Sequence, residues 1–301
     1  MHASHSNAEH INRGILFMVL AVFCFALMDV AMKHLAGHLS TFQVSFFRGA
    51  TSLPFILLWL VVAKRVHRIK PVRTKLHIVR ALLTIGFLTM TVITLRELPL
   101  ANAYAIFFVA PLLITLLSVP LLKEHVGIHR YSAVVVGFIG VLVMLNPNAM
   151  GFMSLGVIAG LLATLGYSLG MILVRYMHRT ETSESLMFFF VVGITVGCGL
   201  LALFDWQSVR WSDTKWLVLL GISGAIAQYL LTEAYRQAPP SVLSSFEYTA
   251  MIWAIGLGYL FWNELPGLWV LAGVAIVIAS GVYISHREAV NKVPVERKLE
   301  H

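Results

Sequence analysis

The sequence predicts an all-α polytopic membrane protein with ten transmembrane helices, arranged as two inverted five-helix repeats. Three observations predict this fold. Of the 301 residues, 58% are hydrophobic and only 12% are charged, against roughly 25% charged in a soluble globular protein. Ten apolar segments have the length of a membrane span, and the second half of the chain repeats positions of the first. A chain this poor in charge is not a soluble enzyme, a disordered chain or a nucleic-acid-binding protein, although its net charge is +8.

The ten spans follow from the length that a helix needs to cross a membrane. About 20 mostly apolar residues, each rising ~1.5 Å, cross about 30 Å of hydrocarbon. Pro99, the pair Pro239 and Pro240, and Pro266 separate several of the segments, because proline cannot donate a backbone hydrogen bond to a continuing helix. We expect spans at residues 14–35, 41–63, 77–98, 100–122, 129–145, 154–178, 186–204, 215–238, 241–263 and 266–285.

The basic residues predict the orientation of these spans. With a cytoplasmic N-terminus, the inside segments hold 16 Lys and Arg residues and the outside segments hold 4. This bias follows the positive-inside rule and makes residues 1–13 and 286–301 cytoplasmic tails. We therefore expect a multi-pass protein of a bacterial inner membrane with both termini in the cytoplasm. The last three residues, 299–301, resemble the remnant of an expression tag and are excluded from function.

The chain also repeats itself, which divides it into residues 14–145 and 154–285. Each repeat holds five spans, and because five is odd the second repeat enters the membrane from the opposite side. An inverted pair of this kind is typical of secondary transporters. The matching positions are Arg96, Pro99 and Glu124 with Arg236, Pro239 and Glu264 at an offset of 140, and Gly14, Ala21, Leu27 and Lys33 with Gly156, Ala163, Leu169 and Arg175 at an offset of 142.

Two blocks of the sequence resemble the repeat of the EamA branch of the drug/metabolite transporter superfamily. One runs from Leu95 through Pro111 to Glu124, and the other from Tyr235 through Glu247 to Glu264. The resemblance covers nearly the whole chain. It implies ten spans in two repeats and a small transported molecule, such as an amino acid, a nucleoside, a cofactor or a drug, with export the commoner direction. Family members often have proline after the Glu of the ninth span, where this chain has Tyr248 and Thr249, so proline gives no reason to expect a kink there.

Ionisable side chains inside the spans are the first candidates for the transport path, because charge at that depth costs several kcal/mol. Glu247, about six residues inside its span, is the strongest candidate: it can exchange a proton or pair with a cationic substrate group. The alternative is a structural hydrogen bond to the 215–238 or 100–122 span. Asp29 either belongs to the path or forms an i,i+4 pair with Lys33.

Three further charges lie within or near the ends of the spans, and each has an expected partner or environment. Arg48 lies about seven residues below the outer end of its span, too deep for comfortable snorkelling, so we expect a carboxylate or carbonyl partner inside the bundle. Arg80 lies near the inner end of its span and is expected to snorkel into lipid headgroups. Glu233 is expected to form a solvated pair with Arg236.

Polar and aromatic residues near Glu247 complete the predicted substrate site, because membrane helices turn polar side chains toward protein or water. An aromatic stripe is more often packing than a ligand cage, so we expect only part of this set to line a cavity. The predicted site comprises Glu247, Asp29, Arg48, Tyr248, Trp253, Gln228, Tyr229, Tyr104, Phe108 and Tyr167.

These residues predict a secondary-active transporter of a small amphipathic metabolite, an amino acid or a related amine or zwitterion, exporting it by alternating access. Uptake of a cofactor-like metabolite such as S-adenosylmethionine or riboflavin is the alternative. A channel or scaffold and an intramembrane enzyme are less favoured.

No phosphate-binding loop for ATP and no zinc-protease helix motif occur in the sequence. Histidines at i,i+4 spacing, His34 with His38 and His125 with His129, fall at helix ends or in loops and favour interfacial polarity over a metal site. We therefore expect no enzymatic activity, no cofactor and no metal. The expected partners are a small-molecule substrate and the lipid bilayer, with no nucleic acid, in a monomer or a homodimer.

Overall fold

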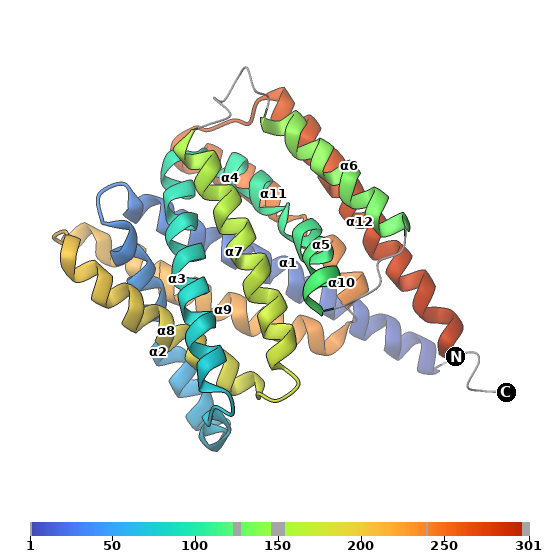
Figure 1. The fold of residues 1–301 in the computed structure, drawn as a ribbon, viewed down its shortest axis with the longest axis horizontal. Coiled ribbons are helices and arrows are strands. Elements are labelled where there is room, and N and C mark those ends of the chain that lie inside the picture. The colour runs from blue at the N-terminus through green and yellow to red at the C-terminus, as the bar shows by residue number, and fades with distance from the viewer. Residues whose placement is uncertain (1, 123–127, 146–153, 239, 297–301) are drawn as a thin grey trace.

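The computed structural model describes residues 2–122, 128–145, 154–238 and 240–296, and within these ranges the only secondary structure is helical (Figure 1). Three short 3₁₀ helices, Val66–Ile69, Leu203–Asp205 and Trp211–Asp213, lie in the connections. The α-helices are α1 His2–Ala36, α2 Thr41–Val62, α3 Thr74–Glu97, α4 Leu100–Phe107, α5 Ala110–Leu122, α6 Ile128–Leu145, α7 Leu155–Met177, α8 Ser183–Ala202, α9 Thr214–Gln237, α10 Pro240–Glu247, α11 Ala250–Trp262 and α12 Leu268–Glu296.

Among the described residues, seven apolar stretches are long enough to cross a membrane as helices. They are His10–Ala36, Thr41–Val62, Thr74–Glu97, Leu100–Leu122, Leu155–Met177, Ser183–Asp205 and Trp211–Gln237. Shorter apolar helices cover Val135–Met144, Ala250–Trp262 and Leu268–Tyr283. The all-helical membrane character is therefore confirmed, while the count of ten spans in two repeats stays a prediction.

Local capping sets several helix starts. The side chains of Ser40, Ser154 and Thr182 accept hydrogen bonds from the backbone N–H groups three residues later, at the starts of α2, α7 and α8. A hydroxyl at this position satisfies a donor that the first turn of a helix leaves unpaired. At α4 the preceding residue is Pro99, which offers no side-chain cap. The start of α4 therefore needs a partner from elsewhere in the molecule.

Two of the expected spans are each broken into a pair of helices. Phe108 and Val109 separate α4 from α5, and 140 residues later Tyr248 and Thr249 separate α10 from α11. The second break occurs without proline. The Thr249 hydroxyl donates to the Phe246 carbonyl oxygen at 2.6 Å, and the Thr249 N–H donates to the same oxygen at 3.1 Å. This three-residue spacing tightens the turn and interrupts the α-helical ladder, so the absence of proline does not remove the break.

The most extensive helix contacts join the two halves of the chain: α1 packs on α9, α3 on α7, α2 on α8, and α6 on α12. Figure 1 shows α6 and α12 side by side along one edge of the molecule. Small residues allow the close approach there, because a Cβ atom at Gly273 would overlap the backbone oxygen of Gly140. A Cβ atom at Gly281 of α12 would likewise overlap the Tyr248 hydroxyl. The break at Tyr248 is thus accommodated by the edge helix.

Candidate substrate-binding site

Two carboxylates inside the bundle each accept a hydrogen bond from a tyrosine on another helix. The Tyr104 hydroxyl of α4 donates to Asp29 Oδ2 of α1 at 2.7 Å. The Tyr235 hydroxyl of α9 donates to Glu247 Oε1 of α10 at 2.9 Å. Both carboxylates are half-buried. Glu247 therefore makes the hydrogen bond to the 215–238 segment that is the structural alternative to a role in the transport path.

Arg48 of α2 supplies a positive charge that interacts with Asp29. Within the described residues, however, the two groups form no ion pair within 4.0 Å. The hydrogen-bond partner of the guanidinium there is the thioether of Met32, with Nη1 to Sδ at 3.9 Å. Thioether sulfur is a weak acceptor, and a guanidinium carries five N–H donors. Among the described residues, Arg48 therefore has no acceptor for most of its N–H groups and no close oxygen partner of the kind that its depth predicts.

Aromatic rings connect the two carboxylate sites. Tyr104 and Phe108 have ring centroids 6.4 Å apart, and Phe108 and Tyr248 have centroids 5.2 Å apart, both in edge-on geometry. Tyr167 of α7 is within electrostatic reach of both Arg48 and Glu247. Six of the predicted site residues, Asp29, Arg48, Tyr104, Phe108, Tyr167 and Tyr248, thus join Glu247 in one group, which we call the central cluster. It offers a guanidinium, two carboxylates and aromatic surfaces.

The remaining predicted residues lie apart from these contacts. Trp253 packs on Phe23 of α1 with ring centroids 4.7 Å apart, and its Nε1 is buried without a hydrogen-bond partner in the described part of the chain. Gln228 is half-buried. Tyr229 is 60% exposed. No described ring contact or side-chain hydrogen bond joins these three residues to the central cluster.

Two charged residues have partners on other segments of the chain. The i,i+4 alternative for Lys33 is not found: its Nζ does not pair with Asp29 but lies 3.1 Å from Glu264 Oε1 and donates to the Leu98 carbonyl oxygen at 2.5 Å. Arg80 donates to the Leu186 carbonyl oxygen of α8 at 2.7 Å. Its reach toward headgroups stays a prediction.

One charge interpretation is confirmed and one partner was missed. The Glu233–Arg236 pair forms at 2.6 Å with Arg236 well exposed. Tyr235, the partner of Glu247, was not among the predicted site residues. The signal lay in the short connection between α9 and α10, because residues just before and after such a turn face each other on adjacent antiparallel helices.

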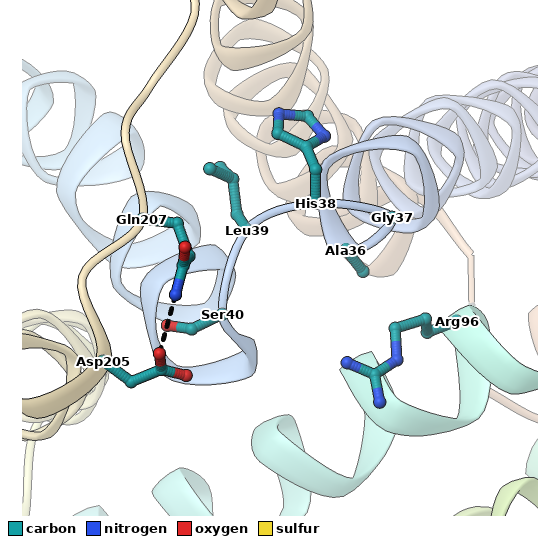
Figure 2. A pocket seen from close by; sticks show the side chains of 8 residues that line it. All are labelled: Ala36, Gly37, His38, Leu39, Ser40, Arg96, Asp205 and Gln207. Carbon is teal, nitrogen blue, oxygen red and sulfur yellow. Dashed lines mark hydrogen bonds between the residues drawn. The ribbon is translucent and has the colours of Figure 1, made fainter.

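A small open pocket lies where α1 joins α2. Its volume is about 220 Å³. Figure 2 shows Asp205 and Gln207 on one side, joined by a hydrogen bond of 2.7 Å, and Arg96 on the other. The residues around it are Ala36, Gly37, His38, Leu39, Ser40, Arg96, Asp205 and Gln207.

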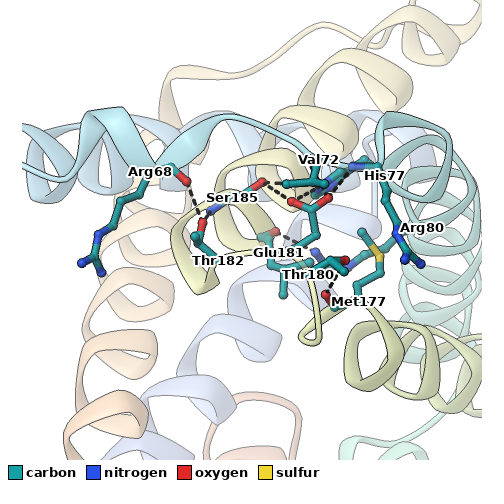
Figure 3. Close-up of polar contacts among 11 residues, drawn as sticks. Arg68, Val72, His77, Arg80, Met177, Thr180, Glu181, Thr182 and Ser185 are labelled. Atoms are coloured by element: carbon teal, nitrogen blue, oxygen red, sulfur yellow. Dashed lines mark hydrogen bonds and ion pairs between the residues drawn. The ribbon is translucent and has the colours of Figure 1, made fainter.

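At the start of α3, the buried carboxylate of Glu181 binds a chain segment that has no side-chain cap (Figure 3). Its Oε1 accepts the backbone N–H groups of Val72 at 3.0 Å and Arg73 at 2.7 Å, and its Oε2 lies 3.3 Å from both His77 Nε2 and the Ser185 hydroxyl. Burial raises the pKa of Glu181, but these hydrogen bonds outweigh it and hold the pKa below its ordinary value.

Potential metal ligands do not gather in the described residues, where no three His, Cys, Asp or Glu side chains lie together. His38 instead contacts Asp213 Oδ2 at 2.9 Å, and His34 stacks on Trp216. Glu124, His125 and the side chain of His129 lie outside the described part of the chain.

The comparisons with known proteins agree with this all-helical bundle. The model of the EamA-like transporter family matches residues 12–146 and 154–285. An uncharacterized transporter of Helicobacter pylori is 28% identical, over 90% of this chain and 94% of its own. An S-adenosylmethionine uptake transporter of Rickettsia conorii is 27% identical, over 93% and 95%. A pseudopaline exporter of Pseudomonas aeruginosa is 23% identical, over 91% and 96%.

A solved crystal structure shows the same fold. It superposes with a TM-score of 0.66 at 18% identity, over 91% of this chain and 98% of that chain. The matched relatives differ in substrate and in the direction of transport, whereas the family model spans both halves of the chain. This chain, with its helical bundle and its charged central cluster, belongs to the EamA-like transporter family.

Proposed function

We propose that this transporter is a secondary-active exporter of a small zwitterionic metabolite, an amino acid or a related amine, and that it works by alternating access. The observation that carries the proposal is the unfilled guanidinium of Arg48 inside the bundle. A charge at this depth is expensive unless a partner satisfies it. A substrate carboxylate would supply two oxygen acceptors in the fork geometry that a guanidinium prefers.

The separation of the charges supports a zwitterion over a simple anion. Asp29 interacts with Arg48 across more than the length of an ion pair, so a molecule carrying both charges can place its carboxylate on Arg48 and its ammonium group toward Asp29. Tyr104, Phe108 and Tyr248 offer aromatic faces beside these charges. A cation or a flat ring binds favourably to such faces.

Glu247 is the proposed proton carrier. Its carboxylate is held by Tyr235, and no cation of the described residues neutralises it. Protonation removes a charge whose burial is costly, so binding and release of a proton can accompany the movement of Glu247 between the two sides. The proposed exporter therefore couples its substrate to protons and needs neither ATP nor a resident cofactor.

Counterflow in proteoliposomes tests the substrate site. We expect Arg48→Gln to abolish saturable counterflow of the carboxylate-bearing substrate found in a thermal-shift screen. Arg80→Gln is the matched control, because Arg80 is a second arginine within a span whose guanidinium is already bonded to α8. Normal counterflow in Arg48→Gln would remove Arg48 from the substrate site, and equal loss in both variants would point to folding.

Uptake of S-adenosylmethionine is a second candidate, favoured by the relatives of that name at 26–27% identity. This molecule carries an amino-acid group that suits Arg48 and Asp29 and an adenine ring that suits the aromatic faces. Two results together would favour this candidate over export. The protein would be stabilised by S-adenosylmethionine but not by riboflavin or free amino acids, and the proton gradient would drive transport inward.

The proposed location is a bacterial inner membrane with both termini in the cytoplasm. In a variant without Cys24 and Cys198, single cysteines at Lys70 and Ser212, both exposed, should react with an impermeant thiol reagent from opposite sides of the membrane. Ser212 should react from outside. Labelling from the same side would contradict the ten-span topology without bearing on the substrate site.

A further inference from the structure

Lys33 is the most fully buried of the lysines that the structure describes, at 8% exposure, and it joins three separate segments. Its Nζ donates to the Leu98 carbonyl oxygen at the α3–α4 joint and pairs with Glu264 Oε1 after α11 at 3.1 Å. The ammonium group also lies 5.3 Å from the ring centroid of Trp262. A buried ammonium needs such partners, because an unpaired one would carry the full cost of desolvation.

Glu264 completes these contacts by capping α4. Its Oε2 accepts the backbone N–H of Leu100 at 2.9 Å, the donor that Pro99 cannot satisfy with a side chain. A carboxylate at a helix start is also favoured by the helix dipole. The left-handed backbone of Asn263, with φ 55°, ends α11 just before Glu264. We call Lys33, Glu264 and the backbone groups of Leu98 and Leu100 the latch.

The latch lies one helical turn from the Asp29–Tyr104 hydrogen bond on both α1 and α4. Lys33 follows Asp29 by four residues on α1, and Tyr104 follows Leu100 by four residues on α4, so each pair shares a helix face. The Asp29–Tyr104 hydrogen bond is one link between α1 and α4, and the latch is the next, through the Lys33–Glu264 pair and the Glu264 cap of Leu100. Moving α4 away from α1 must break both.

We infer that the latch is a gate that closes this end of the transport path and that Lys33 and Glu264 are positioning residues, which hold Tyr104 on Asp29 while the gate is shut. Opening the latch releases the hydroxyl of Tyr104 and exposes Asp29 to the same side. The inference rests on the proposed function only for what Asp29 binds. The gating itself requires no known substrate.

Several features make the latch reversible. The side chain of Glu264 is 22% exposed, so water can replace Lys33 as its partner when the segments separate. Two residues of the open pocket of Figure 2 are close in sequence to the latch: Ala36 follows Lys33 by three residues, and Arg96 precedes Leu98 by two.

Thiol labelling of purified protein in detergent, where both ends are open to the reagent, tests the gate. The reporter is Ala101→Cys, in the first turn of α4 and buried in the closed state, in a chain without Cys24 and Cys198. Glu264→Gln should raise its labelling rate about tenfold, because loss of the charge shifts the population toward the open gate. A second reporter, Thr232→Cys near the other end of α9, should not gain reactivity.

Glu97→Gln is the matched control. Glu97 lies at the same joint but pairs with its neighbour Arg96 at 3.1 Å, with both side chains exposed, so it links no second helix. It should leave both reporters unchanged. Faster labelling of both reporters in Glu264→Gln would mean local unfolding, and no change at Ala101→Cys would mean that the latch does not gate; either result overturns the inference. Failure to find a transported substrate would count against the proposed function alone, because the labelling experiment uses no substrate.

Discussion

The two tyrosine–carboxylate pairs of the central cluster share a hydrogen bond but differ in the charges around it. Asp29 has the positive charge of Arg48 in electrostatic reach, and its donor Tyr104 is only 7% exposed. Glu247 has no cation of the described residues near it, and its donor Tyr235 is 43% exposed. The same bond therefore belongs to a carboxylate with a cation in reach at Asp29 and, among the described residues, to one without a cation at Glu247.

From this difference we propose separate roles for the two groups. Asp29 and the charge of Arg48 together offer the two opposite charges that complement a zwitterion. A carboxylate held by a single neutral donor in low dielectric loses little by becoming neutral. We therefore propose substrate recognition at Asp29 and proton exchange at Glu247, and four variants test that division.

The largest effect is expected from Glu247→Gln, which keeps the shape of the side chain but cannot ionise. Transport driven by a proton gradient should fall to the background of empty liposomes, while counterflow continues, because counterflow needs no net proton movement. Glu233→Gln, which breaks only the exposed pair with Arg236, should leave both unchanged. If Glu247→Gln shows normal transport driven by the proton gradient from about pH 5 to about pH 8, Glu247 has a structural role and does not carry the proton.

A smaller effect is expected from Asp29→Asn. Loss of a charge-assisted contact should raise the substrate concentration for half-maximal counterflow about tenfold. Coupling to the proton gradient should persist, since Glu247 is intact. Loss of coupling with unchanged substrate affinity would exchange the roles that we assign to the two carboxylates.

The smallest effects are expected from removing one hydroxyl at a time. Tyr104→Phe should lower the free energy of unfolding by about 1 kcal/mol, because it takes a hydrogen bond from a half-buried carboxylate. Tyr235→Phe should cost less, because water can reach its exposed side and replace the lost donor. Thermal unfolding in detergent measures both. A larger loss for Tyr235→Phe would show that exposure does not separate the two pairs.

Much of the fold was predictable because apolar length is a local property. The expected span 41–63 is the helix Thr41–Val62, and 154–178 contains Leu155–Met177. The interruption of the 241–263 segment could not be predicted, because it depends on the hydrogen bond of the Thr249 hydroxyl and on the space that Gly281 leaves for Tyr248. Both are set by tertiary packing.

In the candidate site too, local sequence predicts some features and tertiary packing determines the others. The cost of charge inside a membrane predicts Asp29, Arg48 and Glu247 as candidates, and the structure brings them into one cluster. Their partners could not be predicted in this way, because helical spacing offers only neighbours one turn away. A pair with Lys33 was one of two alternatives for Asp29, whereas the folded chain gives Lys33 Glu264 from the other half of the sequence.

The carboxylate of Glu181 at the start of α3 makes the stability of the protein depend on acidity. Its pKa is lower in the folded chain than its ordinary value of 4.5, so folding favours the ionised form. This contribution is fully present above the unfolded pKa and is lost as the pH falls through the folded one. Acidification below about pH 4.5 should therefore loosen the α3 start and the α7–α8 connection, even if the membrane-embedded helices stay packed.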